Sequence, residues 1–149
     1  MARKTKDLGF SLIELLIVVG VLLILASIAV PNLLKARRAA NEASAVASLR
    51  AIASGQLAYR DTQGAFTNLI GLNQEKIIDD VLLSGTKSGY DFVTAPGTMP
   101  SLEFTATAAP VVPSGIAATG NRYFFVNQDQ VIRFEIGTAA DSTSSPLND

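Results

Sequence analysis

The stretch DLGFSLIELLIVVGVLLILASIAVPN, residues 7–32, is the most hydrophobic part of this 149-residue chain. Between residues 10 and 30, four positions interrupt the apolar run: Ser11, Glu14, Gly20 and Ser27. A helix of that length extends about 31 Å, which matches the hydrocarbon core of a bilayer. The stretch therefore predicts a helix that spans a membrane. Glu14 does not fit this pattern, because a carboxylate at the centre of a lipid-embedded helix costs about 2.5–3.5 kcal/mol on insertion scales.

The composition narrows the possible chemistry. The chain has no cysteine and no histidine. Disulfides, thiolate nucleophiles, serine–histidine–aspartate triads and zinc sites built from Cys and His are therefore excluded. The formal net charge of −1 gives no indication of nucleic-acid binding. We expect a protein that is not an enzyme and that uses neither a metal nor a cofactor.

Two ordinary explanations of the apolar stretch are open at this point. Three basic residues flank the stretch on each side: Arg3, Lys4 and Lys6 before it, and Lys35, Arg37 and Arg38 after it. Because the two sides are equal, charge alone does not orient a spanning helix. The stretch is either a plain single-span anchor or a secretory signal peptide with the apolar core Leu15–Leu25 and small residues Ser27 and Ala29 near a cleavage site. Neither explains Glu14, since an ionisable residue in a spanning helix is by default functional and needs a partner.

The residues around Glu14 form a specific motif. A short basic leader precedes GFSLIE, residues 9–14, and an apolar helix follows it. This pattern closely resembles the type IV pilin and pseudopilin family. The resemblance implies that a prepilin peptidase cuts between Gly9 and Phe10, that residues 1–9 are a cleaved leader, and that the new amine of Phe10 is methylated. It also implies that Glu14 faces the Phe10 amine of a neighbouring subunit, where the two charges lower each other's cost of leaving water.

The same resemblance implies a function. The chain would be a structural subunit of a type IV pilus, held in the bacterial inner membrane as a precursor. The inner-membrane pilus assembly machinery would then polymerise it into an extracellular helical filament of identical copies. A pseudopilin of a type II secretion system is the alternative within the family, and an exported soluble binding domain behind an ordinary signal peptide is the alternative from another class.

Sequence patterns that the chain lacks help to distinguish a pilin from a pseudopilin. The major pseudopilin commonly has Trp-Gly and Asp-Gly-Gly patterns around a calcium site, and this chain has neither. Their absence favours a pilin. Many pilins have a C-terminal cysteine pair, which this chain also lacks.

The helical pattern continues beyond Pro31. Pro31 has no N–H for the carbonyl of Ser27, and its ring crowds that turn. Strong helix formers nevertheless resume directly after it, and an apolar stripe follows at helical spacing: Val46, Leu49, Ala53 and Leu57. We predict one helix over about residues 10–60 that is kinked or loosened between Gly20 and Pro31.

This helix divides the chain into functional parts. Residues 10–34 would be the transmembrane and filament-core helix, and residues 35–149 a globular head that includes the amphipathic half of the helix. Phe10, Glu14 and Pro31 are the expected assembly residues.

The rest of the chain predicts a small sheet. A short helix is expected over Gln74–Leu83, with Thr67 and Asn73 as candidate N-caps. Four strands follow: Tyr90–Thr94, Leu102–Thr107, Tyr123–Asn127 and Val131–Ile136. A hairpin turn is expected at Asn127–Gln130, and a loose polar tail after residue 137. The predicted fold class is α+β, a long N-terminal helix with its apolar half protruding and its amphipathic half packed on a four-stranded antiparallel sheet.

Charged residues suggest two further sites. Arg37, Arg38 and Glu42 are candidates for ion pairs between subunits, and the alternative is a surface pair of Arg38 with Glu42 at i, i+4, worth a few tenths of a kcal/mol. Asp79, Asp80 and Asp91 are candidate calcium ligands, but their spacing is not that of an EF-hand loop. A solvated acidic face is the favoured interpretation.

Overall fold

The computed structural model describes residues 10–147, which fall into two compact units divided after Lys35. The described part of the first unit, residues 10–35, is called the apolar segment below. The described part of the second, residues 36–147, is called the head.

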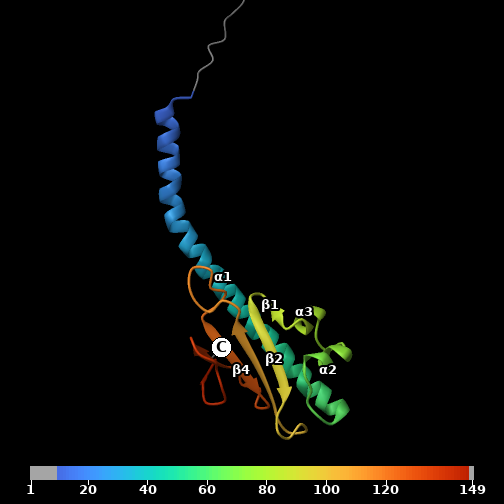
Figure 1. Ribbon diagram of the computed structural model, residues 1–149. Coiled ribbons are helices and arrows are strands. Elements are labelled where there is room, and N and C mark those ends of the chain that lie inside the picture. Colours follow the sequence, from blue (N-terminus) through green and yellow to red (C-terminus); the bar gives the residue numbers. More distant parts are fainter. Residues whose placement is uncertain (1–9, 148–149) are drawn as a thin grey trace, which may run out of the picture. The chain divides into compact units, whose positions relative to one another are not determined.

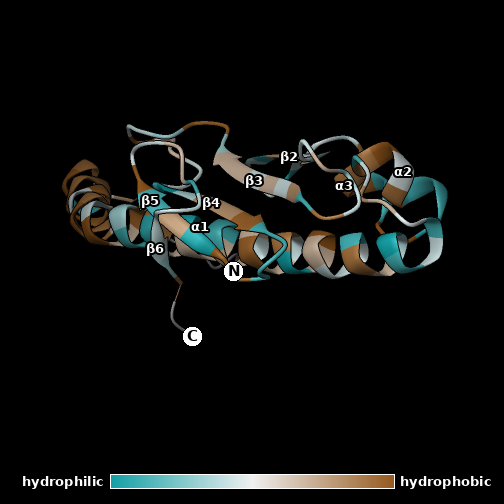
Figure 2. Cartoon of the chain, turned by 90° about the horizontal axis from the view of Figure 1, so that it is seen from below, coloured by the Kyte–Doolittle hydropathy of each residue, from teal (hydrophilic) through white to brown (hydrophobic). Residues whose placement is uncertain are grey.

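Helix α1 (Leu12–Gln63) contributes to both units and contains Pro31 within its helical backbone. This confirms the prediction of one long N-terminal helix. In the head, the predicted stripe faces the core, since Leu49 and Ala53 are buried and Leu57 packs against the buried cluster. Apolar and polar residues alternate along this half of α1 (Figure 2), as an amphipathic helix on a sheet requires.

The sheet of the head has six antiparallel strands in the order β1 to β6. They are β1 (Thr86–Lys87), β2 (Tyr90–Pro96), β3 (Phe104–Pro110), β4 (Arg122–Asn127), β5 (Arg133–Ile136) and β6 (Ser145–Pro146). The predicted four strands correspond to β2 to β5, and the predicted number was wrong because two strands at the edges were missed. Each missed strand has only two residues, too few to show an alternating pattern.

The short helices also differ from the prediction of one helix over Gln74–Leu83. The structure has α2 (Leu69–Gln74) and α3 (Asp80–Leu83) instead. Their N-caps are Asn68 and Asp79, whose side chains accept hydrogen bonds from the backbone N–H of the third residue of each helix. Between the helices, Lys76 has a positive φ of 56°, a conformation that interrupts a right-handed helix.

The core lies between α1 and one face of the sheet. Figure 1 shows α1 running across the sheet, with α2 and α3 beside β1 and β2. Alternate residues of the central strands face α1 and are buried: Tyr90 and Phe92 from β2, Phe104, Ala106 and Ala108 from β3, and Phe124 and Val126 from β4. The period-2 burial fixes the register, because a one-residue slip would expose this whole set.

Gln56 is the polar exception in this core. Its side chain is fully buried, and its Nε2 donates to the carbonyl oxygen of Thr67 at 2.5 Å and to Thr94 Oγ1 at 3.0 Å. Its Oε1 accepts from the Thr67 N–H at 3.0 Å. Thr94 in turn donates to the carbonyl of Thr105 at 2.9 Å. One helical side chain thus links α1 to β2 and to the chain entering α2.

The region after residue 137 is ordered by specific hydrogen bonds, so the prediction of a loose tail was wrong for its described part. Asp141 accepts bonds from Thr143 and Ser144 in a tight turn. The Leu147 N–H donates to the carbonyl of Ile132 at 2.8 Å. The predicted turn at Asn127–Gln130 is confirmed by a 3.1 Å backbone bond between its end residues.

Candidate functional site

The apolar segment exposes its large side chains. Between Leu12 and Leu33 these leucines, isoleucines and valines are 45–81% exposed. Of the described helices, α1 is the one long and apolar enough to cross a membrane, and the relevant part of it is not buried in the fold. It is therefore no core helix of a soluble domain. Burial of such side chains contributes about 1.5–3 kcal/mol each, so this surface requires lipid or other protein around it.

Phe10 and Glu14 lie at the start of this segment. Phe10 precedes α1 and is 71% exposed, while Glu14 is exposed in the first helical turn, where the helix dipole favours a carboxylate. Among residues 10–147 nothing pairs with Glu14, and the first described cation after it is Lys35. Twenty-one helical positions separate them, or about 31 Å. Gly9, the other residue of the predicted cleavage site, lies outside the described residues.

Pro31 and Gly20 are the helix-weakening residues of the segment. Both lie within α1. The carbonyl of Ser27 has no donor from Pro31, because proline lacks an N–H. At Gly20 an added Cβ would meet nothing within 4 Å, so no packing in the described chain requires glycine there.

Arg37 and Arg38 have different environments. The Arg38 guanidinium donates to the carbonyl oxygens of Gly115 at 2.6 Å and Ala118 at 3.3 Å, and so ties α1 to the connection between β3 and β4. Arg37 is exposed, and within residues 10–147 its side chain makes no ion pair. Of the two arginines, only Arg37 is therefore free in the described chain to bind another molecule.

Glu42 also bonds inside the head. Its carboxylate is 10% exposed and accepts from Arg122 Nε at 2.7 Å and from the Asn121 N–H at 2.9 Å. Arg38 and Glu42, which are both described, do not pair with each other, so the i, i+4 interpretation was wrong. The Arg122 carbonyl accepts from the Tyr90 hydroxyl at 2.9 Å. Burial, together with the Glu42 charge, raises the pKa of Tyr90, which keeps this hydroxyl a donor.

The sequence did not indicate Arg122 or Asn41 as functional. Arg122 lies 80 positions from Glu42, and Asn41 donates to the carbonyl of Thr119, 78 positions away, at 2.9 Å. No local spacing connects residues so far apart. The available signal was the position of Glu42, four residues before Val46 of the apolar stripe, because a carboxylate on the packed face of a helix needs a cation or donors.

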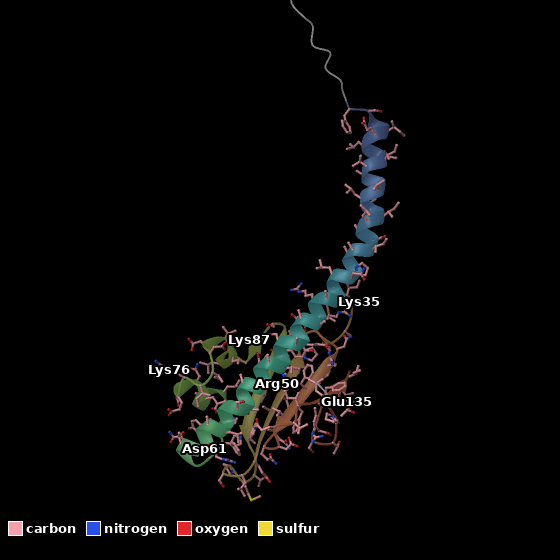
Figure 3. The ribbon with its side chains drawn as sticks, turned by 180° about the vertical axis from the view of Figure 1, so that it is seen from behind. Lys35, Arg50, Asp61, Lys76, Lys87 and Glu135 are labelled. Carbon is pink, nitrogen blue, oxygen red and sulfur yellow. The ribbon has the colours of Figure 1, made fainter. Side chains whose placement is uncertain are left out.

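The acidic residues weighed as calcium ligands do not form a site. Each bonds to a neighbour in the head: Asp79 to Lys87 Nζ at 2.9 Å, Asp80 to Asn73 Nδ2 at 3.0 Å, and Asp91 to Thr86 Oγ1 at 2.7 Å. Lys87, on β1, is labelled in Figure 3. The Leu82 N–H and Lys87 lower the pKa of Asp79. Within residues 10–147, no three acidic side chains come together as metal ligands.

Known proteins share both the motif and much of the chain. Residues 4–30 match the family model described as the prokaryotic N-terminal methylation motif. The type IV major pilin protein PilA of Myxococcus xanthus is 31% identical over 122 residues, covering 80% of this chain and 51% of that protein. A type IV wide pilus major component of Thermus thermophilus is 31% identical over 118 residues, 79% of this chain and 70% of that protein. The chain belongs to the type IV pilin family.

Family membership confirms the resemblance seen in the sequence and agrees with the pilin fold of a long helix on an antiparallel sheet. This pilin spans about half the length of its Myxococcus relative. No solved structure matches it significantly. Pilins are structural proteins, and membership therefore favours a structural role over an exported binding domain behind an ordinary signal peptide.

Proposed function

We propose that this pilin is the major structural subunit of a type IV pilus. The observation that carries the proposal is the exposed apolar segment, which belongs to the same unbroken helix that anchors the head. An apolar surface of this size is stable in water only when other copies or lipid cover it. Both relatives reported above are themselves named as major pilus components.

The route to the filament begins with processing. We infer that a prepilin peptidase of the bacterial inner membrane cuts between Gly9 and Phe10, and that the amine of Phe10 is then methylated. The motif match over residues 4–30 supports this step. The inner-membrane assembly machinery would then move the apolar segment from lipid into an extracellular pilus, where copies of the same segment bury one another.

Glu14 would favour one axial register between neighbouring copies during assembly. Its partner would be the Phe10 amine of a neighbouring copy, because residues 10–147 provide no cation within reach of its carboxylate. A carboxylate and an amine that leave water together are tolerated only when they pair. A copy docked in the wrong register would leave both charges unpaired, and such a filament would not grow.

Variants of Glu14 test this proposal. Glu14→Ala should enter the membrane and be cut as in the wild type, yet yield few sheared filaments when it is the only subunit. Glu14→Gln, which keeps shape and hydrogen bonding without charge, should give an intermediate yield. Ser27→Ala is the matched control, since it also removes a polar group from the apolar segment.

The readouts are filament protein relative to membrane protein, and intact mass. A chain that begins at Phe10 supports the processing step, whereas retention of residues 1–9 refutes it. Normal filaments from Glu14→Ala would refute the pairing of Glu14 with the Phe10 amine. A wild type that yields no filaments would refute the pilus function itself.

Arg37 is the remaining candidate for a charge contact between subunits. Arg38 and Glu42 stabilise the head from within, so changing either of them confounds folding with assembly. We propose that Arg37 alone of the three makes the contact between copies. Arg37→Gln should lower filament yield without lowering the thermal stability of the head, and its effect should weaken at high salt.

A further inference from the structure

The connection between β3 and β4, residues 111–121, has an unusual composition for a surface loop. No charged side chain occurs anywhere from residue 104 to residue 121. This β3–β4 loop lies beside α1 and is orange in Figure 1. Surface loops are usually polar and mobile. The absence of charged side chains from a loop of this length therefore calls for an explanation.

The loop is held in place by hydrogen bonds at several points. Val112 and Thr119 bond across it, with the Thr119 N–H donating to the Val112 carbonyl at 2.8 Å and the Val112 N–H to Thr119 Oγ1 at 3.1 Å. The Val111 N–H donates to the carbonyl of Gly89 at 3.0 Å. From α1, Arg38 and Asn41 bond its carbonyl groups. The backbone of the loop is therefore fixed to both the helix and the sheet.

Although its backbone is fixed, the loop exposes apolar side chains to solvent. Ile116 is 80% exposed, Val111 47% and Val112 37%. A single exposed apolar residue is ordinary. Here, however, ordering the loop costs conformational entropy, and within the described chain that order does not bury Ile116. Such an arrangement is suited to presenting Ile116 to a partner.

We propose that the β3–β4 loop docks the apolar segment of a second copy of this chain through Ile116. This inference rests on the proposed function, which brings many copies together. The chemistry of the two surfaces matches: residues 15–34 have no charged side chain, and most of their large apolar side chains are exposed. Arg38 already donates hydrogen bonds to loop carbonyl groups, so docking need not supply new acceptors for its guanidinium.

The position of the loop along α1 supports this partner. Arg38 and Asn41, which hold the loop, follow the end of the apolar segment within two turns of the same helix. The loop is therefore bonded to the same helix whose apolar half is proposed to form the filament core.

Photo-crosslinking in filaments tests the proposal directly. A benzophenone amino acid at position 116 of the full chain should yield crosslinked dimers from sheared filaments, with the attached peptide within residues 10–34. The same probe in place of Val93, 62% exposed on β2, is the matched control and should not yield that product. Crosslinks to the head only, to lipid only in membranes, or to nothing would overturn the proposal.

A pair of substitutions measures the contact. Burying an isoleucine fully changes an association constant by roughly ten- to a hundredfold. Ile116→Thr should therefore lower the share of this pilin in filaments by about tenfold, with unchanged circular dichroism, while Val93→Thr should have little effect. Normal filaments from Ile116→Thr would refute the docking role while leaving the pilus function intact. A wild type without filaments would refute both.

Discussion

Replacing Gln56 with leucine should destabilise the head substantially. Gln56 is fully buried and links α1 to two segments through three hydrogen bonds, two of which satisfy the backbone N–H and C=O of Thr67. Leucine has nearly the same size, so the substitution leaves no large cavity. It does leave the two backbone groups of Thr67 without their partner, at about 1–3 kcal/mol for each buried group. Because Thr67 is only partly buried, we expect a total loss of about 2–4 kcal/mol.

Thermal unfolding of the full chain in detergent measures this loss. For a domain of this size it corresponds to a fall in Tm of roughly 5–20 °C. The matched control is Gln63→Leu, because Gln63 lies on the same helix but is exposed and makes one 3.4 Å bond to Glu75. It should change stability by less than about 0.5 kcal/mol. Equal stability of the Gln56→Leu variant and the wild type would show that the buried network contributes nothing net, and would refute this reasoning.

Three further changes should have defined effects. Gly120→Ala should destabilise the head, because its Cβ would collide with the Tyr90 side chain, and Tm would show this. Since the fold lowers the pKa of Asp79 below its ordinary value of 3.8, its charge contributes stability above that pH, and this stability is lost as the pH falls below 3.8 through the lowered pKa of the fold. The Tm difference between the wild type and Asp79→Asn should therefore shrink on going from pH 7 to pH 3, and a constant difference would contradict the role of Lys87. Pro31→Ala should stiffen the apolar segment, so filaments of this variant should extend less under a given force.

The sequence predicted the elements that have strong periodicity. The 3.6-residue stripe on α1 and the alternation in β2 and β3 both reflect burial of one face, which composition along the chain records directly. The bounds and number of the short helices were predicted incorrectly for a different reason. Asn68 and Asp79 act as caps only once the chain has turned there, and several other polar residues nearby were equally plausible caps. Tertiary packing determines which of several candidate residues acts as the cap.

The charged residues show most clearly why the site was only partly predictable. A motif with fixed spacing places Glu14 close to the proposed cleavage point, and the significance of Glu14 depends on residues within a few positions of it. Glu42 and Arg38 depend on partners far away along the chain, at Arg122 and in the β3–β4 loop. Their spacing of four on a helix suggested that they pair with each other, but the head provides each with another partner. Glu42 binds the Arg122 guanidinium, and Arg38 binds carbonyl groups of the β3–β4 loop. We therefore propose contacts between copies at exposed side chains such as Arg37 and Ile116, which make no ion pair or core contact within the described head.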